Sequence, residues 1–241
     1  MPTLEVCLSP NLLPLHTLTH KTVVVVDILR ATSCMVTAIA CGVESILPLQ
    51  DIETCRAMKS QGYYIAAERD GKQVEGFDLG NSPFSYMEKH LIGQKIAFTT
   101  TNGTQVIKLS ENSEQIIVGA FLNLSAVASY LAEQKKDVLV ACAGWKGNIN
   151  VEDTLFAGAL VDILASQNFT ISNDSALLAQ PLYQKNQSDL LGFVSLCSHV
   201  QRLKNLGIQK DIEFCLQKDV YDVVPVLQNG NLVKLTSQIA S

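Results

Sequence analysis

The chain has few charged residues and no basic stripe. Only 17% of its 241 residues are charged, and the formal net charge is −5. Proteins that bind nucleic acid usually carry a clustered basic face, so we expect no nucleic acid partner. Because 47% of the residues are hydrophobic, the chain is instead expected to fold as a globular protein with a large core.

Long apolar runs and paired cysteines are also lacking. The longest apolar runs fall well short of the roughly 20 residues of a membrane span, and the first residues, Met1, Pro2 and Glu5, do not suit a signal peptide. The seven cysteines are scattered, with no C-x-x-C pair. We therefore expect no membrane partner, no zinc, and reduced thiols in a cytoplasmic protein.

Three common phosphate-handling motifs are absent. No G-x-x-x-x-G-K-[ST] loop occurs, and Asn148 stands where a cysteine phosphatase loop starting at Cys142 would need arginine. Asp27-Ile28-Leu29 lacks the second aspartate of the D-x-D motif of haloacid dehalogenases. The chain is therefore not expected to use any of these three mechanisms.

The few histidines do not follow the predicted strands. They are expected at the surface or at caps, and are His16, His20, His90 and His199. Catalysis is therefore expected to depend on carboxylates and a metal and not on an imidazole base.

Apolar runs alternate with capped helical segments along the chain. Strands are expected at 23–26, 44–49, 63–67, 95–98, 116–119 and 138–142, and helices at 31–40, 51–61, 83–90, 123–133 and 150–165, with a short one ending at Leu109. Farther on, helices are expected near 175–180 and 188–206, and strands near 213–216, 223–227 and 232–235, the last two joined by Asn229-Gly230.

This alternation predicts a layered α/β/α fold with a mixed, largely parallel sheet. The C-terminal hairpin is expected to form an antiparallel edge. We expect a single domain over 1–241, with two closely packed halves, about 1–120 and 121–241, as the alternative. A homodimer is an open alternative for its assembly.

Polar residues and glycines follow four of the predicted strands. They are Asp27 and Arg30 after the first, Glu68, Arg69, Asp78, Asn81 and Ser82 after the second, Thr100, Thr101, Asn102, Gly103 and Thr104 after the third, and Gly144, Lys146, Gly147, Glu152 and Asp153 after the fourth. If the strands are parallel, these loops open at one edge of the sheet, where such folds bind ligands.

The gathered carboxylates predict a divalent cation. Acids crowded in a low dielectric repel one another, and Mg²⁺ relieves this with a few carboxylates, water and substrate oxygens. The candidate ligands are Asp27, Glu68, Asp78, Glu152 and Asp153. Taken singly, Asp27 is as well explained as a helix cap, and the last two as partners of a helix dipole.

The basic residues and glycine loops predict an anionic substrate. Arg30, Arg69 and Lys146 suit a phosphate or sulfonate, and the loops 100–104 and 144–147 can present backbone N–H groups to it. Surface ion pairs and ordinary turns are the alternatives. We assign catalysis to Asp27, Arg30, Glu68 and Arg69, and substrate binding to Thr100, Thr101, Asn102, Gly103, Thr104, Gly144, Lys146, Gly147, Asn81 and Ser82.

Five blocks of these loops, in order, resemble the 2-phosphosulfolactate phosphatase family. They are Asp27-Ile28-Leu29-Arg30-Ala31-Thr32, Glu68-Arg69-x-Gly71, the stretch from Gly76 to Pro83, Thr100 to Thr104, and Cys142-Ala143-Gly144-x-x-Gly147 with Glu152-Asp153. The resemblance runs over about 22–160, with a weaker echo at 219–225. Ser33-Cys34 and Asp70 depart from it without removing a charge.

The resemblance implies a Mg²⁺-dependent phosphatase that converts (R)-2-phospho-3-sulfolactate to sulfolactate and phosphate, a step toward coenzyme M. It leaves open whether water or Asp27 attacks the phosphate. The alternatives are a phosphatase of another small 2-phosphohydroxy acid and a non-catalytic protein that binds an anionic metabolite.

Overall fold

The computed structural model describes residues 1–204 and 206–235. Its strands are β1 (Thr3–Cys7), β2 (Lys21–Val26), β3 (Ser45–Pro48), β4 (Tyr64–Arg69), β5 (Lys72–Gln73), β6 (Lys95–Thr99), β7 (Gln115–Gly119), β8 (Asp137–Cys142), β9 (Thr170–Ile171), β10 (Pro225–Gln228) and β11 (Asn231–Lys234). The α-helices are α1 (Ala31–Ala40), α2 (Ile52–Ala57), α3 (Gly103–Leu109), α4 (Leu124–Gln134), α5 (Val151–Ala165), α6 (Asp174–Asn186), α7 (Leu190–Val194), α8 (Ser198–Lys204) and α9 (Gln209–Cys215). The 3₁₀ helices are η1 (Pro10–Leu15), η2 (Met58–Gln61), η3 (Pro83–Met87), η4 (Lys89–Leu91) and η5 (Phe121–Asn123).

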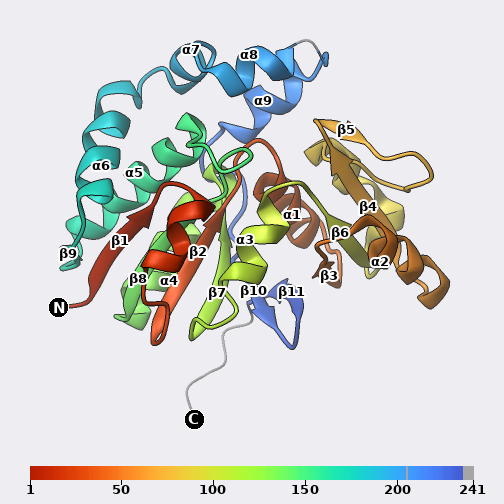
Figure 1. The fold of residues 1–241 in the computed structure, drawn as a ribbon, viewed down its shortest axis with the longest axis horizontal. Coiled ribbons are helices and arrows are strands. Elements are labelled where there is room, and N and C mark those ends of the chain that lie inside the picture. Colours follow the sequence, from red (N-terminus) through yellow and green to blue (C-terminus); the bar gives the residue numbers. More distant parts are fainter. Residues whose placement is uncertain (205, 236–241) are drawn as a thin grey trace.

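An 11-stranded sheet runs through the molecule in the order β5-β4-β6-β3-β11-β10-β7-β2-β8-β1-β9 (Figure 1). Strands β7, β2, β8, β1 and β9 form one parallel block, and β3, β6 and β4 form a second. The antiparallel pairs involve β5, β10 and β11. The predicted layered α/β fold with a mixed, largely parallel sheet is therefore confirmed.

The C-terminal hairpin does not lie at an edge of the sheet, so that prediction is wrong. Strands β10 and β11 join the two parallel blocks, with Val226 opposite Ile117 of β7 and Leu232 opposite Ile46 of β3. Val226 and Leu232 are buried, and an edge position would have left more of their apolar surface in water.

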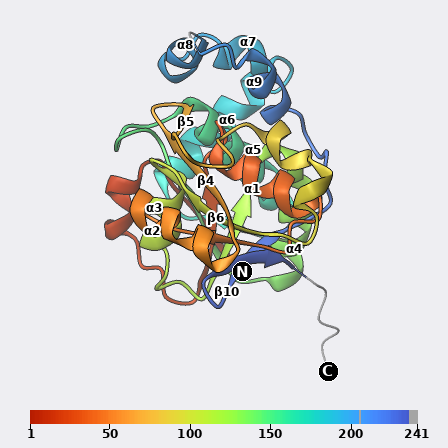
Figure 2. The ribbon, with the colours of Figure 1, turned by 90° about the vertical axis from the view of Figure 1, so that its right-hand side faces the viewer.

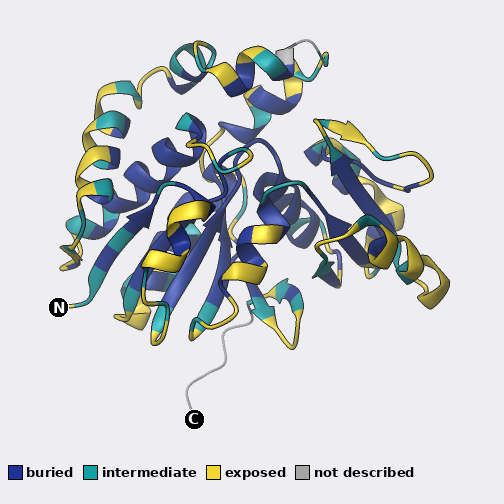
Figure 3. Ribbon diagram, viewed as in Figure 1, coloured by how far each residue is buried: buried dark blue, intermediate teal, exposed yellow. Residues whose placement is uncertain are grey.

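Helices cover both faces of the sheet. Figure 2 shows α2 and α3 on one side and α1, α4 and α5 on the other. The strands are buried along most of their length (Figure 3), and Val23 to Val26 of β2 have no exposed surface, as expected for a strand covered on both faces. No helix in residues 1–204 and 206–235 is long and apolar enough to cross a membrane. The division into one domain or two halves stays a prediction.

The helices α7, α8 and α9 form what we call the helical arm, described over residues 190–204 and 206–215. In Figures 1 and 2 it lies above the loops at one end of the sheet. Two predictions fail here: the helix expected over 188–206 is divided into α7 and α8, and the strand expected at 213–216 is the end of α9. Asp211, Ile212 and Cys215 are buried at helical spacing, which explains α9. The helix expected over 83–90 is likewise two short 3₁₀ helices, η3 and η4.

Candidate active site

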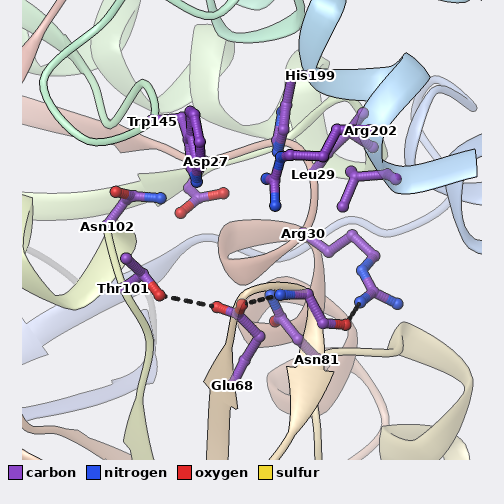
Figure 4. A pocket seen from close by; sticks show the side chains of 12 residues that line it. Asp27, Leu29, Arg30, Glu68, Asn81, Thr101, Asn102, Trp145, His199 and Arg202 are labelled. Atoms are coloured by element: carbon purple, nitrogen blue, oxygen red, sulfur yellow. Dashed lines mark hydrogen bonds between the residues drawn. The ribbon is translucent and has the colours of Figure 1, made fainter. Parts of the chain in front are cut away.

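A small polar pocket lies between the sheet loops and the helical arm (Figure 4). Its walls are formed by Asp27, Leu29, Arg30, Glu68, Gly71, Asn81, Thr101, Asn102, Trp145, His199, Arg202 and Leu203. Loops of both parallel blocks contribute, because Asp27 follows β2 whereas Glu68 belongs to β4. The structure therefore brings together six of the residues that the sequence predicted for the site.

The surroundings of Asp27 disfavour the charged form of its carboxyl group. Burial raises the pKa of its carboxyl group to about 7, although His199 and the Ala31 N–H lower it, and the negative charges of Glu68 and Glu152 raise it further. Its side chain accepts one long hydrogen bond, 3.5 Å from the Ala31 nitrogen. Asp27 therefore caps α1 only weakly, and a cation would stabilise its charged form.

Glu68 is held at the pocket wall by its neighbours. Its Oε1 accepts a hydrogen bond from the Gly71 N–H, and its Oε2 lies 3.5 Å from the Thr101 hydroxyl, which donates to it. Gly71 has φ of +85°, and a Cβ there would lie 2.4 Å from Leu206 Cδ1. The glycine therefore lets the β4–β5 turn approach the end of α8 closely while its N–H orients Glu68.

Arg30 forms a buried ion pair at one end of the pocket. Its side chain is 5% exposed and donates to the Asp211 carboxylate of α9, and its Nη2 donates to the Gly71 carbonyl at 3.0 Å. Asp211 also accepts from the Ser82 hydroxyl at 3.0 Å. Arg30 therefore forms an ion pair, but a buried one and not the surface pair given as the alternative, and Ser82 contacts Asp211 beside the pocket.

Arg69 and Lys146 are also engaged by protein groups. The Arg69 guanidinium donates to the Glu68 carbonyl at 2.6 Å and to the Thr99 hydroxyl at 3.1 Å, and Arg69 does not line the pocket. The exposed Lys146 ammonium lies 3.4 Å from the Asp70 carboxylate. The structure thus does not place these two predicted anion-binding groups in the pocket.

Three of the five predicted metal ligands lie outside the pocket wall. Asp153 accepts hydrogen bonds from the backbone nitrogens of Ile28 and Gly144 at 2.9 and 3.0 Å, so it ties the β2 loop to the β8 loop. Its pKa is raised well above the ordinary value by burial and by the charges of Glu152 and Asp27. The hydrogen bonds of Asp153 therefore indicate a structural role for its carboxylate, which holds the two loops together.

Asp78 and Glu152 have other partners. Asp78 accepts from the Lys59 ammonium at 2.6 Å and from the Ile65 N–H at 3.0 Å, so it is used to fix the loop after β5. Glu152 is fully buried and contacts His199. No group of three or more His, Cys, Asp or Glu side chains that could hold a metal occurs among residues 1–204 and 206–235.

His199 lies in the pocket, so the expectation of a surface or capping role is wrong. It is 8% exposed, and its Nδ1 faces the Glu152 carboxylate and lies 3.2 Å from the Asn150 side-chain nitrogen. His199 is the second residue of α8, and the helical arm carries it over the sheet loops. Sequence reasoning missed it because only the tertiary position of the arm brings it to Asp27.

The loop after β6 presents Thr101 and Asn102 to the pocket. Thr100 and Thr104 instead bond to each other, with the Thr104 hydroxyl donating to the Thr100 carbonyl at 3.1 Å. A Cβ at Gly103 would lie 3.0 Å from Asp27 Oδ2 and 2.8 Å from Ala31 Cβ, so glycine leaves room for the carboxylate.

The loop after β8 is a tight turn that presents an aromatic ring. Trp145 and Asn148 exchange backbone hydrogen bonds at 2.9 Å, and a Cβ at Gly144 would lie 2.1 Å from the Asn148 carbonyl oxygen. The Gly147 carbonyl accepts from the Ser9 hydroxyl at 2.6 Å. Gly144 and Gly147 thus shape the turn, and Trp145 is the residue that reaches the pocket.

Comparison with known proteins identifies the family. A profile of the 2-phosphosulpholactate phosphatase family matches residues 7–230. Similar proteins include the probable 2-phosphosulfolactate phosphatases of Thermotoga petrophila, 42% identical over 87% of this chain and 90% of the relative, and of Caldanaerobacter subterraneus, 38% identical over 88% and 90%. That of Microcystis aeruginosa is 37% identical over 94% of this chain and 97% of the relative. The chain belongs to the 2-phosphosulpholactate phosphatase family.

Membership makes the protein a phosphoric monoester hydrolase and confirms the resemblance. The matched region includes the helical arm as well as the sheet loops. The pocket residues that the sequence did not predict are Leu29, Gly71, Trp145, His199, Arg202 and Leu203. Three of them lie on the arm, which has no recognisable motif, and Trp145 sits unmarked inside a predicted glycine loop.

Proposed function

We propose that the protein hydrolyses (R)-2-phospho-3-sulfolactate to sulfolactate and phosphate, with Mg²⁺ as cofactor. The observation that carries the proposal is the pair of carboxylates, Asp27 and Glu68, in one buried polar pocket. We take the identity of the substrate from the names of the relatives. A phosphatase of another small 2-phosphohydroxy acid is the alternative that the experiment below separates.

The donor set fits Mg²⁺. This ion is commonly bound by one or two carboxylates together with water and substrate phosphate, and Asp27 and Glu68 are the carboxylates of the pocket wall. Within the described part of the chain, the Asp27 carboxylate accepts only the long bond from the Ala31 N–H, so its oxygens have capacity for a cation. When bound, Mg²⁺ would neutralise charge on the phosphate and polarise the ester.

The remaining pocket side chains suit the substrate. The Thr101 hydroxyl and the Asn102 amide face the space beside Asp27 and Glu68, where they can hold phosphate oxygens (Figure 4). His199, oriented through Nδ1 by Glu152, can donate a proton to the alcohol oxygen as its bond to phosphorus breaks. The attacking group is water or Asp27, and trapping of a phosphorylated Asp27 would identify the second.

The test is phosphate release by the purified protein from a panel of phosphate esters, with Mg²⁺ and after EDTA treatment. We expect 2-phosphosulfolactate to have the highest kcat/KM, and Asp27→Asn and Glu68→Gln to lower it by about 10²-fold or more, as loss of transition-state charge stabilisation typically does. Asp78→Asn is the matched control, because Asp78 pairs with Lys59 and should leave turnover near wild type.

Two results would contradict the proposal. A higher kcat/KM for another ester would reject the substrate, and full turnover after EDTA treatment would reject the cation.

A further inference from the structure

We propose that Arg202 and Trp145 form a subsite for the second anionic group of the substrate, the carboxylate or sulfonate that phosphate transfer does not touch. The inference rests on the proposed function and adds a specificity-determining residue to it. It predicts that the enzyme selects phosphate esters of acids over esters that carry phosphate alone.

The first observation is the state of the Arg202 side chain. Its guanidinium carbon lies 4.3 Å from the centre of the Trp145 ring, and its Nε is buried without a hydrogen-bond partner. Among residues 1–204 and 206–235, no carboxylate forms an ion pair with Arg202. A half-buried guanidinium without a counter-ion, in a pocket wall, is suited to an anion that arrives with the ligand.

The second observation is that the other cations near the pocket are already engaged by protein groups. Arg30 is neutralised by Asp211, Arg69 bonds to main-chain and hydroxyl oxygens, and Lys146 lies near Asp70. A substrate with phosphate, carboxylate and sulfonate brings more negative charge than one divalent cation neutralises. Of the basic side chains in the described pocket wall, Arg202 is the one left to balance it.

The third observation is where Arg202 and Trp145 lie relative to the two carboxylates of the pocket. Figure 4 shows Arg202, His199 and Trp145 on one side of Asp27, and Glu68 and Thr101 on the other. A phosphate held between Asp27 and Glu68 would therefore extend its organic part toward the arm. The guanidinium lies over the indole ring, and this cation–π contact helps to hold it where it can bind an oxyanion.

The experiment compares substrates that differ in their second anion. Wild type, Arg202→Lys and Arg202→Met are assayed with 2-phosphosulfolactate, with 2-phospholactate, which lacks the sulfonate, and with p-nitrophenyl phosphate, which lacks both anions. Arg56→Met is the matched control, because Arg56 also stacks on an aromatic ring, 4.8 Å from the centre of Phe77, but does not line the pocket.

We expect Arg202→Met to lower kcat/KM for 2-phosphosulfolactate by roughly 10- to 100-fold, the usual worth of charge-assisted hydrogen bonds, and mainly through KM. Turnover of p-nitrophenyl phosphate should change little, and Arg202→Lys should recover only part of the loss. If Arg202→Met loses as much kcat/KM with 2-phospholactate as with 2-phosphosulfolactate, Arg202 binds the carboxylate. If the loss with 2-phospholactate is much smaller, Arg202 binds the sulfonate.

Equal losses with all three esters, or no loss with any, would overturn the subsite. Calorimetric titration of sulfolactate into wild type and Arg202→Met separates this inference from the proposed function. If wild type hydrolyses no 2-phosphosulfolactate, the proposed function fails. The subsite then stands only if sulfolactate binds wild type at least about 10-fold more tightly than Arg202→Met, and it is rejected otherwise.

Discussion

At the scale of single residues, the pocket concentrates negative charge that the protein alone does not neutralise. Asp27 is buried, Glu68 and Glu152 lie near enough to raise its pKa, and Arg30 of the same loop is committed to Asp211. This uncompensated charge destabilises the folded protein when no ligand is bound. It also strengthens the binding of a cation, because the cation relieves the repulsion between the carboxylates. The same charges that are unfavourable for folding are thus the ones expected to act in the reaction.

The first residue-scale prediction concerns pH and Asp27→Asn. The pKa of Asp27 is raised from an ordinary 3.8 to about 7 in the folded protein, so the folded state holds this proton more tightly than the unfolded state. Binding of this proton stabilises the folded protein fully below the pKa that Asp27 has in the unfolded chain. This stabilisation is lost as the pH rises through 7. Without metal, Asp27→Asn should therefore melt several degrees above wild type at pH 8, with the difference vanishing toward pH 4.

Thermal melts in EDTA across this pH range provide the measurement. A variant that melts below wild type at pH 8 would show that the Asp27 carboxylate is already well compensated in the metal-free protein.

A second residue-scale prediction concerns the Arg30–Asp211 pair. Both side chains are less than a tenth exposed, so Arg30→Met leaves the Asp211 charge buried and should cost about 3–5 kcal/mol of unfolding free energy. Arg30→Met/Asp211→Asn should recover much of this loss, because the new amide carries no charge and its carbonyl oxygen can still accept from Ser82. Urea unfolding of the single and double variants measures the coupling, and additive losses would refute a strong pair.

At the scale of elements, the helical arm depends on close contact with the β4–β5 turn. Gly71 and Gly62 both have φ of +85°, but a Cβ at Gly71 would meet Leu206 Cδ1 at 2.4 Å, whereas a Cβ at Gly62 meets nothing within 4 Å. Alanine at either site carries a left-handed backbone penalty of about 1–2 kcal/mol. Only Gly71→Ala should also displace the Leu206 side chain, which packs the arm against this turn beside the pocket.

The measurement is kcat/KM beside a thermal melt for Gly71→Ala and Gly62→Ala. We expect similar backbone costs but a large kinetic defect only in Gly71→Ala, partly restored by adding Leu206→Ala. Equal kinetic effects of the two alanines would mean that contact with the arm does not control the site.

Elements differ in how far the sequence predicts them, for physical reasons. The central strands and the helices α1, α4 and α5 were predicted because their apolar runs are bounded in the sequence by glycine or by residues that favour helix ends. The arm was predicted poorly because its short helices are held by contacts with other parts of the chain, such as Asp211 with Arg30. Local patterns place Asp27 and Glu68 at strand ends, but they cannot show that His199 and Arg202 meet them.

At the scale of the whole molecule, the pocket joins the two parallel blocks of the sheet. Asp27 follows β2 of one block, Glu68 lies near the end of β4 of the other, and within the sheet the blocks are connected through the β10–β11 hairpin. A ligand bound by both carboxylates would therefore stabilise the blocks against separation as well as serve the reaction.

The final prediction is that Mg²⁺ and sulfolactate together stabilise the whole fold, and that removal of Mg²⁺ reverses this. A ligand at about 100 times its dissociation constant adds about 2.7 kcal/mol, and about 2–4 °C per kcal/mol is expected for a chain of this size. The melting temperature should rise by this amount when Mg²⁺ and sulfolactate are added, and should return to its starting value with EDTA. Asp27→Asn and Glu68→Gln should each abolish the shift, because each removes the contribution of one block, whereas Asp78→Asn should retain it. A shift that survives in both pocket variants would place the cation elsewhere in the molecule.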